Sequence, residues 1–394
     1  MPGAKLLLNM AEQIQRGLEG VLVAESELSY IVGSVGKLVY RGYAIEDLAR
    51  DASFEEVLYL LWHGDLPTAS ELQEFSEKLA SERAVEDAVL EMVHRLAETD
   101  EEPMAALRTA TSVLSIAEPE ADADAENLDA SLAKGRRITA KILTVLAAFE
   151  RVRQGKEPVE PREDLSFAGN FLYMLTGAEP DDVSEETFDM AVTLHADHGL
   201  NALTFAAIVV GSTMADVYSA VTAGVGALSG PLHGGANQDV MEMLHEVDAS
   251  DKDPVEWAKQ AREDGRRFPG FGNRVYKVKE PRAVILEEKL RDLSESTGDT
   301  EWLDYTTAIE AYLEDEGLGE KGISPNVDFF SGSVYDHLGI SMDMYTPIFV
   351  MARAPGWIAH TLEYQEENRL IPPTCPLHGR EERRFRPARH AVKV

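Results

Sequence analysis

Apolar residues recur at helical spacing along most of this chain, from residue 45 to residue 366. In the first stretch, apolar positions 54, 57, 58, 61 and 62 share one helix face, with Asp51 and Ser53 as N-cap candidates. The same spacing predicts helices over 72–79, 85–96, 104–116, 138–151, 165–175, 185–195, 204–228, 240–247, 254–265, 282–295, 301–314 and 347–366. Strand-like alternation is confined to the first 45 residues, where 21–24 and 37–40 predict a small hairpin. The predicted fold class is therefore all-α.

The length and the placement of glycine and proline predict two domains. The chain has 394 residues, of which 44% are hydrophobic, enough for a large core. Glycine and proline cluster at 224–235, 265–281 and 317–325, between the helical blocks. We expect a large domain formed by 1–229 and 331–394, with a small domain at 230–330 inserted into it. The acidic segment 118–129 is poor in apolar groups and predicts an exposed loop.

The charge balance excludes one class of partner and indicates a habitat. The formal net charge is −33, so a surface for nucleic acid is not expected, because it would repel phosphate. The 70 acidic residues face 13 Lys and 24 Arg, in a chain that is not poor in aromatics. This skew is typical of globular proteins from a high-salt cytoplasm, where a Debye length of ~3 Å screens like charges.

Composition predicts the cellular compartment and sets the C-terminal tail apart from the rest of the chain. No apolar run reaches the ~18 residues that span a bilayer, and the N-terminus does not resemble a signal peptide. A single cysteine, Cys375, excludes an internal disulfide, so the expected location is cytoplasmic and no membrane partner is expected. From Pro372 onward the tail holds six Arg or Lys and two acids. It is either a basic extended tail, or a tail that is divergent or comes from an altered reading frame.

Three separated segments carry residues suited to chemistry. His233 lies between a Gly-Pro pair and a Gly-Gly pair, which leaves room for a substrate and frees backbone N–H groups. His195–Gly199 lies upstream and Pro325–Asp328 lies downstream. Imidazoles and a carboxylate spread over roughly 130 residues predict a site that folding assembles.

The upstream histidines and two arginines are candidates for binding an anion. His195 and His198 have the i, i+3 spacing that places side chains near one helix face. A zinc site would need two more ligands and the one cysteine is far away, so no metal is expected. An anion or carbonyl contact fits better. Arg282 and Arg353 precede apolar helical runs and are candidate carboxylate clamps, although surface arginines in such places are common.

The downstream carboxylate and a glycine-rich loop complete the candidates. Phe329 and Phe330 follow Asp328, and desolvation by them would raise its pKa and make it a stronger base. Asp328 is equally suited to cap a helix that begins there, and both interpretations can hold. The loop Phe268–Gly272 has neither the Walker A nor the dinucleotide-binding spacing. It is suited to presenting backbone groups to a flat ligand such as adenine.

As a set, these segments resemble the citrate synthase family over about residues 17–369. The resemblance rests on Gly17–Val21, Tyr40–Tyr43, Leu60–Gly64, His195–Gly199, Pro231–Asn237, Pro269–Tyr276 and Pro325–Asp328. It implies an all-α homodimer with a large domain, a mobile small domain and an active site in the cleft between them. The implied reaction, at the entry to the tricarboxylic acid cycle, condenses acetyl-CoA with oxaloacetate and water to give citrate and CoA.

The resemblance also implies a role for each candidate. Asp328 would take a methyl proton from acetyl-CoA, and His233 would hydrogen-bond the enol oxygen as its charge develops. His198, Arg282 and Arg353 would bind oxaloacetate. The residues implied to hold CoA, with Lys321 near a phosphate, are Phe268, Pro269, Gly270, Phe271, Gly272, Lys321, Gly322, Ile323 and Ser324. No cofactor is implied, because acetyl-CoA is a substrate.

Three positions depart from the family pattern. Asn273 stands where the family has a histidine that polarises the oxaloacetate carbonyl and protonates the new alkoxide. An amide can donate a hydrogen bond but cannot deliver a proton near neutral pH, and losing a general acid lowers rates by roughly 10²–10⁴-fold. Pro372 stands where the family has an arginine that reaches the partner's site, a contact of ~1.5–3 kcal/mol. Gly199 stands where an acid is commoner.

Two alternatives to an active citrate synthase follow. A 2-methylcitrate synthase would use propionyl-CoA, and its one added methyl is worth only ~1–3 kcal/mol in a pocket. A citrate-synthase-like protein that binds CoA or a dicarboxylate with little turnover is favoured by Asn273 and Pro372.

Overall fold

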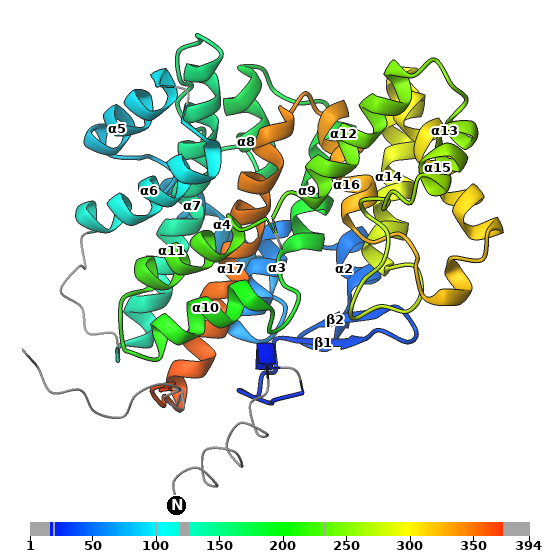
Figure 1. Cartoon of the computed structure of the whole chain (residues 1–394). Coiled ribbons are helices and arrows are strands. Elements are labelled where there is room, and N and C mark those ends of the chain that lie inside the picture. Colours follow the sequence, from blue (N-terminus) through cyan, green and yellow to red (C-terminus); the bar gives the residue numbers. More distant parts are fainter. Residues whose placement is uncertain (1–15, 19, 100, 119–125, 232–233, 373–394) are drawn as a thin grey trace, which may run out of the picture. The chain divides into compact units, whose positions relative to one another are not determined.

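The computed structural model describes residues 16–18, 20–99, 101–118, 126–231 and 234–372. It confirms the all-α prediction, because helices carry nearly all of the fold (Figure 1). The α-helices are α2 (Ile45–Asp51), α3 (Phe54–His63), α4 (Ala69–Ser81), α5 (Asp87–Glu98), α6 (Pro103–Leu114), α7 (Leu128–Arg153), α8 (Phe167–Thr176), α9 (Asp182–His195), α10 (Ala202–Gly211), α11 (Val217–Leu228), α12 (Ala236–Ala249), α13 (Pro254–Glu263), α14 (Pro281–Thr297), α15 (Glu301–Asp315), α16 (Asp328–His337) and α17 (Tyr345–Glu366). Single 3₁₀ turns are η1 (Arg16–Leu18), η2 (Ser115–Ala117), η3 (Gly319–Lys321) and η4 (Met342–Met344).

Helix starts follow the capping residues in the sequence. The Ser53 hydroxyl accepts a hydrogen bond from the Glu56 backbone N–H at 3.3 Å, and the Glu56 carboxylate accepts one from the Ser53 N–H at 2.8 Å. This capping box satisfies two N–H groups that would otherwise lack partners at the start of α3. Ser53 is therefore confirmed as a cap, whereas Asp51 is the last residue of α2 and caps nothing.

The prediction of one helix over 204–228 is wrong. The chain forms α10 and α11, because Met214 adopts φ +63°, a left-handed conformation that no α-helix contains. Asp216 then begins α11 by accepting a hydrogen bond from the Ser219 N–H at 3.0 Å. Apolar periodicity runs through the break, so the pattern alone hides it.

The small sheet differs from the predicted hairpin in one strand. Strand β2 (Lys37–Tyr40) pairs antiparallel with β1 (Ser29–Val32) and with β3 (Tyr43–Ala44), in the order β1-β2-β3. The predicted strand over 21–24 is wrong, since those residues form no strand. Ser29–Val32 lies only four residues before β2, across the turn at 33–36, so closing this hairpin orders much less chain than pairing with 21–24 would.

Helix α17 lies at the centre of the large core. It packs against α7, α9, α10 and α11, and its residues 347–361 are buried almost without interruption (Figure 1). Glycines allow this close approach. A Cβ added at Gly224 of α11 would lie 2.6 Å from Trp357, and one at Gly135 of α7 would lie 2.6 Å from Ile358. The apolar faces predicted from periodicity therefore meet around one buried helix.

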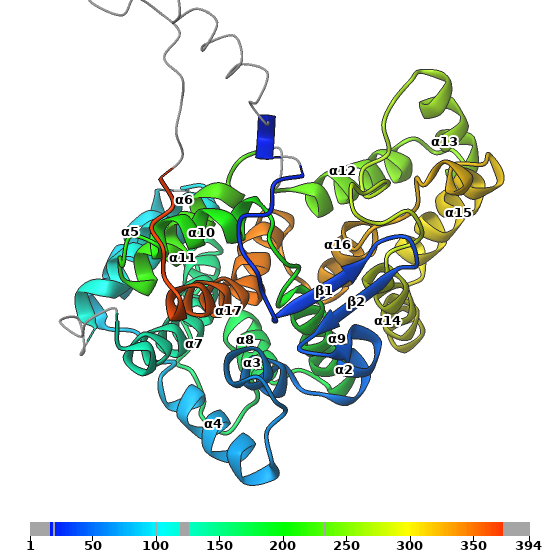
Figure 2. The ribbon, with the colours of Figure 1, turned by 90° about the horizontal axis from the view of Figure 1, so that it is seen from below.

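Helices α12 to α16 gather on one side of the unit formed by residues 26–369. Figures 1 and 2 both place them away from α4 to α7, and α14 contacts α16 and α15. Helices α12 to α15 fall within the predicted small domain at 230–330, and α16 begins at its end and runs beyond it. The domain boundaries themselves stay a prediction.

The acidic segment 118–129 is only partly described. Glu118 is buried, contrary to the predicted exposed loop, because its carboxylate accepts hydrogen bonds from Arg137 and from the Tyr218 hydroxyl. Residues 119–125 lie outside the described part of the chain. Within the described part, no helix is long and apolar enough to cross a membrane.

Candidate active site

The C-terminal end of α9 organises the candidate site. The Leu194 carbonyl accepts hydrogen bonds from Arg282 Nη1 and from the Tyr40 hydroxyl, both at 3.3 Å. The next carbonyl, that of His195, accepts one from Arg353 Nε. The last carbonyls of a helix have no intrahelical partner and carry partial negative charge, so two guanidinium groups are stabilised there. Residues from β2, α14 and α17 thus converge on one helix end.

Both arginines are buried and remain charged. Arg353 is 2% exposed, and burial lowers its pKa to about 10, which still leaves it protonated near neutral pH. Burial acts to lower the pKa of Arg282, but the Glu280 carboxylate together with Tyr276 and Tyr40 outweighs it, and the pKa is raised. Among the residues that the structure describes, none forms an ion pair with Arg353. Its charge is therefore available to an anionic ligand.

The two histidines predicted on one face take different roles. Helix α9 ends at His195, so His198 lies beyond it and the shared-face prediction is wrong. His195 is buried, its Nδ1 lies 2.6 Å from the Ala191 carbonyl, and burial lowers its pKa to about 3. His198 Nε2 lies 3.2 Å from the Tyr276 hydroxyl. Burial, with Arg282 and Arg353, holds the pKa of His198 well below its usual range, so its ring is neutral at pH near ~7.

Asp197 fixes the turn that presents His198. Its carboxylate is fully buried, contacts His360 Nε2 at 3.1 Å and accepts a hydrogen bond from the Gly199 N–H at 2.9 Å. Burial alone would raise the Asp197 pKa, but His360 and Arg353 outweigh it and hold the pKa well below its usual range. Gly199 has φ +61°, which favours glycine and accounts for its presence in this turn.

Asp328 is the first residue of α16 and does not cap it. The Asn326 side-chain oxygen accepts the Asp328 N–H at 3.0 Å, so the capping interpretation of Asp328 is wrong. Burial raises the pKa of the Asp328 carboxyl to about 6, and Glu280 and Asp239 act in the same direction. Arg282 and Arg353 oppose this shift. The result is a carboxylate that is ionised near neutral pH yet more basic than an ordinary aspartate.

The two segments predicted to hold CoA lie side by side, next to Asp328. The Gly272 N–H donates to the Ser324 carbonyl, and the Asn326 N–H donates to the Gly270 carbonyl, both at 2.9 Å. Phe271 and Pro325 form an isolated antiparallel bridge between them. Gly270 has φ +75°, and a Cβ there would lie 2.8 Å from Phe329 Cα, so this close approach requires glycine.

The remaining residues of these segments differ in exposure. Phe268 is half-buried and packs edge-on against Trp257, with ring centroids 6.3 Å apart. Pro269 and Ser324 are also half-buried. Lys321 and Ile323 are exposed on either side of Gly322, whose φ of +71° turns the chain after η3. Together, the two segments present an ammonium group, a loop backbone and apolar side chains.

Asn273 directly follows this loop. Its side chain is half-buried, and its amide oxygen accepts the Val275 N–H at 2.8 Å. That bond leaves the amide nitrogen as the group able to donate to a substrate carbonyl.

Comparisons with known proteins agree over nearly the whole chain. A family model described as "Citrate synthase, C-terminal domain" matches residues 17–374. The chain belongs to the citrate synthase family. The citrate synthase of Haloferax volcanii is 56% identical over 379 residues, which are 96% of this chain and 99% of that protein. The crystal structure of citrate synthase from Pyrobaculum aerophilum has a TM-score of 0.89 at 38% identity, covering 95% of each chain.

A further solved structure bears on ligands. It is the ternary complex of carboxymethyl coenzyme A and oxaloacetate with citrate synthase from Thermoplasma acidophilum, with a TM-score of 0.86 at 32% identity. It covers 95% of this chain and 98% of its own. A relative named 2-methylcitrate synthase 1, from Corynebacterium glutamicum, is 37% identical over 380 residues, 95% of this chain and 98% of its own. The protein is therefore an enzyme of the acyltransferase type.

For a citrate synthase, the fold brings most predicted site residues together. The α9 end joins Arg282 and Arg353, and the electrostatic influence of both reaches Asp328 and His198. His233 lies outside the described residues. The glycines after it are described: Gly235 has φ +88°, and a Cβ at Gly234 would lie 2.3 Å from the Leu228 carbonyl.

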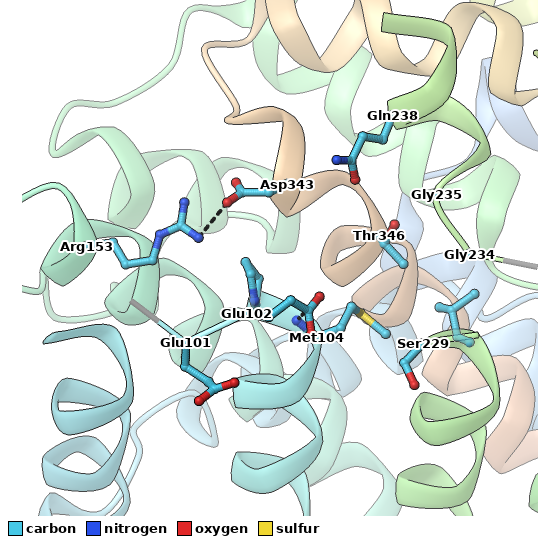
Figure 3. Close-up of a pocket in the computed structure, with 12 residues that line it drawn as sticks. Glu101, Glu102, Met104, Arg153, Ser229, Gly234, Gly235, Gln238, Asp343 and Thr346 are labelled. Atoms are coloured by element: carbon cyan, nitrogen blue, oxygen red, sulfur yellow. Dashed lines mark hydrogen bonds and ion pairs between the residues drawn. The ribbon is translucent and has the colours of Figure 1, made fainter. Parts of the chain in front are cut away.

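A pocket of about 390 Å³ adjoins these glycines (Figure 3). Arg153 and Asp343 form an ion pair of 2.6 Å at its wall, and Glu101, Glu102 and Gln238 also line it. None of the described residues predicted for the active site of this citrate synthase lines the pocket. No group of three or more His, Cys, Asp or Glu side chains within the described residues is arranged to hold a metal ion.

Sequence reasoning missed four residues that shape the citrate synthase site. Tyr40, Tyr276, Glu280 and His360 are each hydrogen-bonded to a site residue or to its backbone. A signal was present for Tyr40 and Tyr276, which lie within the motifs of the resemblance. Glu280 precedes the Pro-Arg pair that contains Arg282, whereas no pattern marks His360.

Proposed function

We propose that this chain condenses acetyl-CoA with oxaloacetate and water to give citrate and CoA, at the entry to the tricarboxylic acid cycle. One observation carries the assignment of roles. A carboxylate of raised basicity, Asp328, begins the helix that directly follows the two paired CoA segments, and two buried arginines influence it. The similarity to a citrate synthase with oxaloacetate and a CoA analogue in its complex supports both substrates.

Oxaloacetate would bind at the α9 end. It carries two carboxylates, and Arg282 and Arg353 supply two desolvated charges at which charge-assisted hydrogen bonds are strong. His198, neutral because of burial and both arginines, would donate a hydrogen bond rather than add a third charge. Lys321 and the loop Phe268–Gly272 would hold CoA, which directs the thioester toward Asp328.

Asp328 would remove a proton from the acetyl methyl group. The methyl group is a very weak acid, so the charge that develops on the thioester oxygen must be stabilised as it forms. His233 is proposed as that donor. The enol carbon then attacks the oxaloacetate carbonyl, and hydrolysis of the resulting thioester releases CoA. A pKa of about 6 keeps Asp328 ionised at working pH while strengthening it as a base.

Asn273 leaves the alkoxide without a proton from its usual source. The amide nitrogen polarises the carbonyl, but the proton has to come from water. This favours turnover below that of a site with a histidine here. The second candidate, a binding protein with little turnover, rests on this residue and on its bond to Val275.

A free-thiol assay tests the activity. Protein with acetyl-CoA and oxaloacetate in concentrated KCl should release thiol, and Asp328→Ala should abolish release while calorimetry still detects oxaloacetate. The matched control is Asp315→Ala, an exposed aspartate at the end of α15, which should behave as wild type. No release from either the wild type or Asn273→His would support the binding protein instead. Faster release with propionyl-CoA than with acetyl-CoA would support the 2-methylcitrate synthase.

We further propose a homodimer formed through α10 and α11. Neither helix contains a charged residue, although 27% of the chain is charged, and Phe205, Val209 and Val210 are only half-buried. A helix that is apolar all round is buried in the functional protein. Phe205→Asp should convert a sedimenting dimer into a monomer, and an unchanged sedimentation coefficient would contradict this surface.

We also propose that the protein works in a high-salt cytoplasm. The net charge of −33 makes the compact state repel itself unless salt screens it. The thermal midpoint should rise with KCl from ~0.1 M to ~2 M, and a midpoint that is independent of salt would contradict the assignment.

A further inference from the structure

Glu280 is a buried carboxylate that the reaction as proposed above does not use. It precedes α14 as its N-cap residue, and its exposure is 0%. Taking a carboxylate out of water is unfavourable unless charge and hydrogen bonds compensate for it. The contacts of Glu280 show what compensates here.

The two oxygens of Glu280 hold two different parts of the site. One oxygen forms an ion pair with Arg282 Nε. The other accepts the backbone N–H of Val327 at 3.1 Å, directly before the first residue of α16, Asp328. The Glu280 N–H also donates to the Pro325 carbonyl at 3.2 Å. One side chain therefore links an arginine on α14 to the start of the helix that carries Asp328.

Of the charged groups around Asp328, Glu280 is the buried acid that acts on its carboxylate. Two arginines act on the carboxylate, Arg282 from α14 and Arg353 from α17. Two acids act against them, Asp239 from α12 and Glu280, and of the two Glu280 has the larger effect. On α16 itself, the buried hydroxyl of Tyr335 is also influenced by Asp328. Because Asp239 is exposed and Glu280 is not, solvent screens the first charge and not the second.

We propose that Glu280 is a positioning residue that couples oxaloacetate binding to proton abstraction: its carboxylate orients Arg282 toward the substrate and fixes the start of α16, which carries Asp328. This rests on the proposed roles of Arg282 and Asp328. Glu280 touches no substrate. It acts through both residues at once, so removing its charge has a double effect that a purely structural residue would not produce.

Glu280→Gln separates charge from shape. The amide has nearly the same volume and retains one acceptor for Val327, but it no longer carries the charge that orients Arg282. Loss of a charge-assisted hydrogen bond predicts a KM for oxaloacetate about 10- to 100-fold higher, with the KM for acetyl-CoA within about twofold of wild type. The acid side of the pH profile of kcat should move to lower pH by about half a unit or more, because the negative charge of Glu280 no longer lies beside Asp328.

Two further variants control the experiment. Glu310→Gln makes the same change on α15, at a carboxylate that accepts a hydrogen bond from Lys279 Nζ at 2.6 Å and belongs to neither half of the site. It should leave both KM values and the acid limb unchanged. Glu280→Asp keeps the charge but shortens the side chain, so it should retain the acid limb of wild type while raising the KM for oxaloacetate.

The outcomes separate this inference from the reaction that it assumes. Equal effects of Glu280→Gln on both KM values, with an unmoved acid limb, would overturn the coupling. If Glu280→Gln does not fold, the Glu280→Asp measurement decides, and a wild-type KM for oxaloacetate would then refute it. If Asp328→Ala keeps its turnover, the failure lies in the role of Asp328 and not in Glu280.

Discussion

Replacing Asp328 with asparagine should abolish turnover and stabilise the protein at the same time. The native carboxyl has a pKa of about 6, raised by burial and by Glu280 from an ordinary value of 3.8. Since the native state holds this proton more tightly than the unfolded state, stability falls as the pH rises from about 4 to about 6. Above that range the ionised carboxylate destabilises the fold by about 3 kcal/mol relative to a neutral side chain. An asparagine has a similar shape but no charge, so it removes this destabilisation.

The stability gained by Asp328→Asn should depend on pH, and this dependence identifies the ionisation of Asp328 as its cause. The free energy of unfolding of Asp328→Asn should exceed that of wild type by up to about 3 kcal/mol near pH ~7. The difference should shrink to about half near pH ~5, where the wild-type carboxyl is mostly protonated in the native state. Urea denaturation of both proteins in concentrated KCl, at both pH values, measures the difference. The control variant, Asp315→Asn, removes one charge at an exposed position. Its free energy of unfolding should differ from that of wild type by the same amount at both pH values.

A variant that is equally stable or less stable at both pH values would refute this reasoning. It would mean that Asp328 is ionised without strain, as an ordinary exposed aspartate is, and the argument for its enhanced basicity would go with it.

Three further predictions follow from the same geometry. The kcat of wild type should fall about tenfold per pH unit below about pH 6, because only the ionised Asp328 accepts a proton; a limb near the ordinary aspartate value would contradict the raised pKa. Asn273→His should increase thiol release by roughly 10²-fold or more, since it restores a proton donor, and an unchanged rate would show that this step does not limit turnover. Tyr40→Phe removes a buried hydroxyl that donates to the Asp197 carbonyl at 2.7 Å, so urea denaturation should show a loss of about 1–3 kcal/mol.

Much of the helical framework was accessible from the sequence. Apolar spacing placed α3, α14 and α15 because a helix presents every third or fourth residue to the core, a property of the local backbone. The cap at Ser53 was readable for the same reason, since its partner Glu56 lies three residues away. The break between α10 and α11 was not readable, because the left-handed Met214 interrupts the helix without interrupting the apolar pattern.

The candidate site divides in the same way. The chemical types and the motifs proposed Asp328, Arg282, Arg353 and His198 from the sequence. The contacts around these residues could be read only from the fold. The Tyr40 hydroxyl, for example, bonds to Leu194 and Asp197, which are more than 150 residues away along the chain. The prediction that Asp328 caps its helix was wrong because the N-cap residue is Val327, and the Asp328 N–H donates to the side-chain oxygen of Asn326.

The sequence by itself determined where most of the helices lie, that the chain is strongly acidic, and which residue types are available for the reaction. These properties depend on neighbours within a few positions or on simple counting. Tertiary structure alone decided that two arginines share the end of α9, that the loop Phe268–Gly272 packs on the start of α16, and that Glu280 joins Arg282 to that helix start. Burial and electric field are properties of groups that folding brings together, so no local pattern specifies them.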